Sequence, residues 1–107
     1  MQTSTLVQAS ARAKGETVVI TLQGRFGCDA HREFSASCDI ALGDRQAKRI
    51  KIDFAGVAQM DNCALGMLLL LRQQAAALGK TVCLSNSFGE VRRLLAIASF
   101  DKVFEMV

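Results

Sequence analysis

The segment "MDNCALGMLLLL", residues 60–71, holds the residues whose types and spacing could do chemistry. Asp61 can cap a helix, an interaction worth about 1 kcal/mol. Asn62 offers a neutral amide that both donates and accepts hydrogen bonds. Cys63 falls in the first turn of that helix, where unpaired amides and the helix dipole can activate a thiol. The segment is therefore a candidate for thiol chemistry or for docking a partner.

Catalysis is the less favoured of these two interpretations. Cys63 has no resolving cysteine close in sequence, and the only histidine, His31, is expected on a polar helix face. Asp53 and Asp61 could be paired for acid–base work, but Asp53 is expected to bond local backbone at a strand end and Asp61 to cap. The sequence predicts a protein that is not an enzyme.

The cysteines do not form a recognisable metal or redox motif. Cys28, Cys38, Cys63 and Cys83 are scattered without a C-x-x-C pair, and one histidine cannot complete a zinc set at these spacings. We expect reduced and mostly packed thiols, no metal and no cofactor. Reduced thiols suit a cytoplasmic location, and the first ten residues lack the basic and apolar regions of a signal peptide.

Composition and charge exclude several other classes of function. Half of the 107 residues are hydrophobic and 21% are charged, which indicates one globular domain spanning residues 1–107. The apolar stretch of residues 64–71 is far shorter than the roughly 20 residues of a membrane span. The net charge of +3 is modest, and the phenylalanines that might stack on bases fall at core spacing, so nucleic-acid binding is not expected.

The hydrophobic period changes repeatedly along the chain and predicts alternating strands and helices. Strands are expected at residues 6–14, 17–25, 49–54, 81–84 and 102–107, the first two joined as a hairpin through Gly15. Helices are expected at residues 30–42, 62–78 and about 88–98. The fold class is therefore α/β, with a mixed, mainly parallel sheet of about five strands and three or more helices packed on it.

Predicted caps place the ends of these helices. Asp29 is expected to cap the first helix and Asp61 the second, with Gly79 as the residue that ends the second helix. Ser87 and Glu90 have the spacing of a capping box for the third. Apolar side chains on nearly all sides of residues 65–71 predict that the second helix is mostly enclosed, with only its ends free to act.

Four segments, in this order and spacing, resemble the STAS domain over residues 6–107. They are "ITLQGRFG", "IKIDFAGVAQMDNCALGMLLLL", "LGKTVCLSNS" and "VRRLLAIASFDKVFEM". The STAS domain is the module of bacterial anti-sigma factor antagonists and of the cytoplasmic tails of sulfate transporters. The resemblance implies a noncatalytic regulator whose partner is an anti-sigma factor that is also a GHKL-type serine kinase, and which is controlled by phosphorylation of a serine directly after the Asp of the second helix.

The chain departs from that pattern at two positions. Asn62 stands where the family has its phosphorylated serine, and Cys63 replaces a second serine, so the family's Asp-Ser-Ser-Ala-Leu-Gly reads "DNCALG" here. Gly27 stands where relatives usually carry Asp, and nearby Asp29 is expected to substitute for it. Asn62 has no hydroxyl to modify, which predicts binding that is not switched by phosphorylation.

The resemblance also indicates which residues meet the partner. The expected contact residues are Gly27, Asp29, Gln59, Met60, Asp61, Asn62, Cys63 and Ala64. The alternative is a STAS-type subunit or regulator of a transporter, such as a lipid transporter, or of another signalling complex.

Overall fold

The computed structural model describes residues 8–107 as a five-stranded sheet with strand order β1-β2-β3-β4-β5. The strands are β1 (Gln8–Lys14), β2 (Thr17–Phe26), β3 (Arg49–Met60), β4 (Thr81–Ser85) and β5 (Glu105–Met106). β1 pairs antiparallel with β2, and all the other neighbours are parallel. The predicted fold class is confirmed, and the hairpin turns at Gly15, whose φ of 63° suits glycine. Residues 6 and 7 of the predicted first strand lie outside the described residues.

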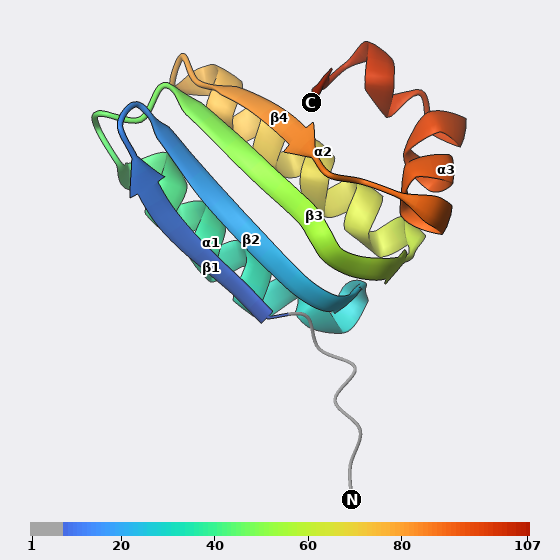
Figure 1. Cartoon of the computed structure of the whole chain (residues 1–107). Helices are drawn as coiled ribbons and strands as arrows, with labels where there is room; N and C mark the ends of the chain where they lie inside the picture. The colour runs from blue at the N-terminus through green and yellow to red at the C-terminus, as the bar shows by residue number, and fades with distance from the viewer. Residues whose placement is uncertain (1–7) are drawn as a thin grey trace, which may run out of the picture.

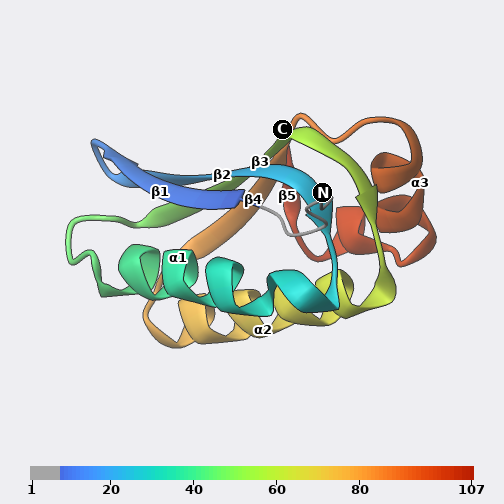
Figure 2. The same ribbon diagram turned by 90° about the horizontal axis from the view of Figure 1, so that it is seen from below.

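Three α-helices accompany the sheet: α1 (His31–Gly43), α2 (Asn62–Ala77) and α3 (Gly89–Ile97). α1 and α2 run side by side under one face of the sheet, and α3 lies at its end beside the curved half of β3 (Figures 1 and 2). This arrangement follows from the right-handed crossovers that join parallel strands. It brings the inner faces of the helices and one face of the sheet into a common core.

The core is built from the alternate residues of the parallel strands and the inner stripes of the helices. Val18, Ile20 and Leu22 of β2 lie beside Ile50 and Ile52 of β3, and all five are at most 2% exposed. The period-2 pattern of these strands therefore gives the burial that the sequence predicts.

β3 is twice as long as the predicted strand of residues 49–54. It continues through "AGVAQM" to Met60, past register shifts opposite Thr21 to Arg25 of β2. Such irregularities bend a strand while keeping it paired. Residues 55–60, which lie beyond the predicted strand, are therefore the curved end of β3, and they carry the chain to the start of α2.

Several predicted helix ends are corrected by the structure. α1 begins at His31 with Ala30 as its N-cap residue, and Asp29 lies inside the preceding 3₁₀ turn, η1 (Cys28–Ala30), so the prediction that Asp29 caps α1 is wrong. α3 starts one residue later than a Ser87 cap requires, with Phe88 as its N-cap residue, so the predicted capping box is also wrong.

The chain's last segment and the surface of α2 differ from expectation too. A second 3₁₀ turn, η2 (Phe100–Lys102), precedes β5, which leaves only two residues in the closing strand. Leu69 and Leu70 of α2 are 44% and 50% exposed, so α2 is a surface helix with a buried stripe and is not enclosed. No helix within residues 8–107 combines the length and apolar character needed to cross a bilayer.

Candidate partner-binding site

The predicted contact residues gather where β2 and β3 end. Phe26 and Met60 pair at the ends of these two parallel strands, and the N–H of Asp61 donates to the carbonyl of Phe26 at 3.2 Å. The residues that follow each strand therefore leave the same edge of the sheet, as expected for parallel neighbours. We call residues 27–29 and 59–64 the α2-tip surface.

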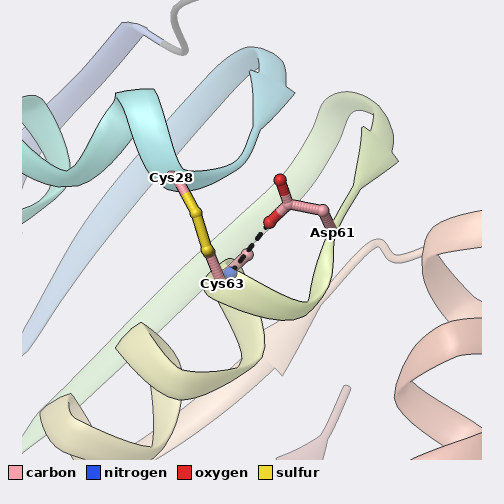
Figure 3. Close-up of a disulfide and its surroundings, with 4 residues drawn as sticks. Cys28, Asp61 and Cys63 are labelled. Atoms are coloured by element: carbon pink, nitrogen blue, oxygen red, sulfur yellow. Dashed lines mark hydrogen bonds between the residues drawn. A yellow bond between two sulfur atoms is a disulfide. The ribbon is translucent and has the colours of Figure 1, made fainter.

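Asp61 organises this surface as the N-cap of α2, as predicted. Its Oδ1 accepts from the N–H of Ala64 at 3.2 Å, and its backbone is extended, with φ −118° and ψ −178°. The cap satisfies one of the amides that a helix start leaves without an intrahelical partner. The turn that follows is thereby fixed, and both Asn62 and Cys63 in it are exposed. Figure 3 shows the capping bond of Asp61 beside Cys63.

The Asp61 carboxylate fills the space beside Gly27 that a larger side chain would need. A Cβ added at residue 27 would lie 2.5 Å from Asp61 Oδ2 and 3.1 Å from its Cγ. Contacts below 3.0 Å are not found for real Cβ atoms. A larger side chain at residue 27 would therefore displace the capping carboxylate from the position that it holds in this chain.

The other predicted residues occupy different depths. Asp29, Gln59 and Asn62 are exposed, Met60 packs partly against the core, and Ala64 is fully buried. Ala64 therefore contributes its N–H to the cap and not its side chain to the surface. All eight predicted residues lie together at this sheet edge, and three of them, Asp29, Gln59 and Asn62, are exposed polar residues on its surface.

Cys28 and Cys63 form a disulfide across the α2-tip surface, which corrects the prediction that all four cysteines are reduced. Their Cα atoms lie 5.1 Å apart, although 35 residues separate them in sequence. Cys38 and Cys83 are free and buried, as predicted. The sequence prediction missed the pairing because it ended β3 at residue 54, whereas in the structure each bonded cysteine comes two or three residues after one of two adjacent parallel strands.

The same corner holds three groups that metals favour. The sulfurs of Cys28 and Cys63 and a carboxylate oxygen of Asp61 all lie within 4.8 Å of one another. Cysteine binds metals as a thiolate, so the disulfide form cannot use either sulfur in this way. The chemistry that this arrangement supports directly is thiol–disulfide exchange at an exposed surface.

The buried Cys38 has a different character. Burial, with a smaller contribution from Asp39, raises the pKa of the Cys38 thiol to about 12. A buried thiol that stays protonated is a poor nucleophile. The reactive sulfur chemistry of the described residues is thus concentrated at Cys28 and Cys63.

Comparisons with known proteins agree with this fold. A family model described as "Mlab, STAS domain" matches residues 9–107. A STAS-domain containing protein of Pseudomonas aeruginosa is 36% identical over 101 residues, covering 94% of this chain and 97% of that protein.

Solved structures of anti-sigma factor antagonists share the fold at low sequence identity. One from Mycobacterium paratuberculosis has a TM-score of 0.82 at 13% identity, covering 94% of this chain and 84% of that one. SpoIIAA in its unphosphorylated form has a TM-score of 0.65 at 21% identity, covering 91% and 96%. With the family model matched along nearly the whole chain, the protein belongs to the Mlab-type STAS domain family.

Proposed function

We propose that the protein is a noncatalytic docking module that binds a protein partner through the α2-tip surface. The observation that carries the proposal is the exposed first turn of α2, held in place by the Asp61 cap at the edge where β2 and β3 end. An exposed polar turn on a rigid frame is suited to recognition, because little conformational freedom is lost when a partner binds.

Asn62 makes this docking independent of phosphorylation at its own position. A phosphoryl group adds about −1.5 to −2 charges to a surface, which disfavours desolvation against a partner. The side chain of Asn62 is exposed and uncharged and carries no hydroxyl. The surface is therefore kept in the state that corresponds to the unphosphorylated form of a switched relative.

Two kinds of partner are consistent with such a surface. The fold shared with anti-sigma factor antagonists supports a GHKL-type anti-sigma factor as the partner, in a cytoplasmic partner-switching pathway. The loss of the phosphoacceptor favours the second candidate, a subunit of a transporter complex, because a permanent subunit needs a steady contact and not a toggled one. Both candidates use the same turn of α2.

Affinity capture with a charge-changing pair of variants tests the proposal. The immobilised protein, Asn62→Asp and Gln73→Glu are each exposed to lysate of the source organism, and retained proteins are identified by mass spectrometry. Gln73 is an exposed residue of the same helix away from the tip, so its variant makes the same amide-to-carboxylate change elsewhere. We expect Asn62→Asp to lose the partner and Gln73→Glu to keep it.

Each outcome of this capture experiment supports a different conclusion. An acidic residue in the first turn of a helix is stabilising, so loss of capture by Asn62→Asp cannot be ascribed to unfolding. A retained GHKL-type kinase supports the first candidate, and the Asn62→Ser variant should then accept phosphate from it. Retained transporter subunits support the second. Equal capture by all three proteins would place the contact elsewhere and refute the proposal.

A further inference from the structure

The disulfide lies inside the surface proposed for docking, beside the residue that replaces the phosphoacceptor. Cys63 follows Asn62 directly, and Cys28 follows Gly27, which packs against the Asp61 carboxylate. Both bonded cysteines are exposed, and the close-up of this corner shows them linking η1 to the first turn of α2 (Figure 3). An oxidant or reductant in solution can therefore reach them without the core opening.

The fold already holds this corner together without the disulfide. Strand pairing joins Arg25 to Gln59 and Phe26 to Met60, and the Asp61 N–H bonds the Phe26 carbonyl. The hydrophobic core does not include either bonded cysteine. Breaking the disulfide is thus expected to loosen only the exposed residues at Cys28 and Cys63, while Ala30 of η1 stays in the core and the sheet and its helices persist.

We propose that Cys28 and Cys63 form a reversible thiol–disulfide switch that controls docking at the α2-tip surface. This inference rests on the proposed function. In the oxidised form the link fixes η1 against α2 and preorganises the surface, which favours binding because less freedom is lost in the complex. In the reduced form the exposed side chains of Cys28 and Cys63 are no longer linked, the surface between them is less ordered, and binding weakens.

The exchange needs only a small disulfide such as oxidised glutathione. The thiolate of one cysteine attacks a glutathione sulfur, breaks its S–S bond and releases one glutathione thiol. The second cysteine attacks the resulting mixed disulfide and releases the second glutathione. Two electrons pass from the protein sulfurs to glutathione, and the two protein thiol protons end on the two released thiols.

Selectivity follows from the positions of the other cysteines. Cys38 and Cys83 are buried, at 5% and 0% exposure, so glutathione reaches neither in the folded protein. Oxidation therefore produces one defined bond and not a mixture. Disulfides in reducing compartments are usually of this transient, sensing kind.

A glutathione titration tests whether the couple is reversible. The folded protein is equilibrated in buffers of varied reduced-to-oxidised glutathione ratio, with EDTA present to keep metals from the thiols, and accessible thiols are counted by maleimide gel shift. We expect two thiols to appear together on reduction and to disappear together on reoxidation. Circular dichroism is expected to show the same secondary structure in both states. Cysteines that stay reduced in the most oxidising buffer, or reduction that unfolds the chain, would overturn the switch.

Capture in each redox state tests control of docking. The oxidised protein, the dithiothreitol-reduced protein and Cys28→Ser/Cys63→Ser are used as baits under the conditions above. We expect the reduced protein and the serine variant to retain about tenfold less partner than the oxidised protein, and the variant to be insensitive to dithiothreitol. Equal retention in both redox states refutes the switch and leaves the proposed function intact, whereas no retention in either state refutes both.

Discussion

Gly27 and Asp61 are coupled so closely that changing one should alter the effect of changing the other. In Gly27→Ala the new Cβ would meet Asp61 Oδ2 at 2.5 Å, so the carboxylate has to rotate away. Its other oxygen accepts the capping bond from the Ala64 N–H at 3.2 Å. The rotation that relieves the overlap therefore removes the cap of α2.

The magnitude follows from two opposing contributions. Loss of the cap costs about 1 kcal/mol of unfolding free energy. Alanine in place of glycine restores about 0.4–1 kcal/mol, because it restricts the unfolded chain and residue 27 has an extended backbone that any residue can adopt. Gly27→Ala is thus expected to be near neutral or slightly destabilising. In an Asp61→Ala background the overlap is gone, and the same substitution should stabilise by about 0.4–1 kcal/mol.

A double-mutant cycle measures this coupling. Urea unfolding of the wild type, both single variants and the double variant, all with the disulfide formed, should give a coupling free energy of about 1 kcal/mol, or about 4–8 °C in Tm. Gly66→Ala is the matched control, since a Cβ there meets nothing within 4 Å, and it should stabilise by about 0.5–1 kcal/mol in either Asp61 background. Identical effects of Gly27→Ala in the two backgrounds would refute the argument.

Three further predictions concern stability. Lys80 donates to the carbonyls of Asp44 and Ala47, so Lys80→Met should lower the free energy of unfolding by about 1.5–3 kcal/mol in urea titrations. The pKa of the Cys38 thiol is about 12 in the folded chain against an ordinary 9.0, so the unfolded chain loses this proton first as the pH rises. Unfolding free energy should therefore fall between pH 9 and 12, and Cys38→Ala should flatten that slope. Removing the disulfide by Cys28→Ser should cost up to about 4 kcal/mol by loop entropy for 35 residues, measured by urea unfolding under oxidising conditions.

Features that depend on local sequence were predictable, and features that depend on long-range register were not. The period of residues 17–22 and 49–54 and the Asp61 cap each involve neighbours within four residues, and the structure confirms them. The length of β3 depends on pairing with β2, so a pattern read from one segment missed its last six residues.

The incorrect helix caps have a related cause. A side chain can cap only if the helix begins at the residue after it, and tertiary packing moves that start by one or two residues. Asp29 falls within a 3₁₀ turn that brings Cys28 toward α2, and Ser87 stands one residue before the actual N-cap of α3. The residue types at both positions suit capping, but the geometry does not use them for it.

The disulfide shows how topology turns two unremarkable cysteines into a functional candidate. Neither residue belongs to a motif, and the pair becomes visible only when β2 and β3 are placed as parallel neighbours that end at one edge. Two positions at which this chain departs from the pattern that it resembles are adjacent. Asn62 has no hydroxyl that could carry a phosphoryl group, and Cys63 next to it has a sulfur that is linked to Cys28 of η1. In the proposed switch, a surface without a hydroxyl at residue 62 is controlled by a covalent link one residue away. Under this account, Cys63→Ser should leave binding weak and insensitive to oxidants, whereas Asn62→Gln, which keeps both the amide and the link, should preserve redox control.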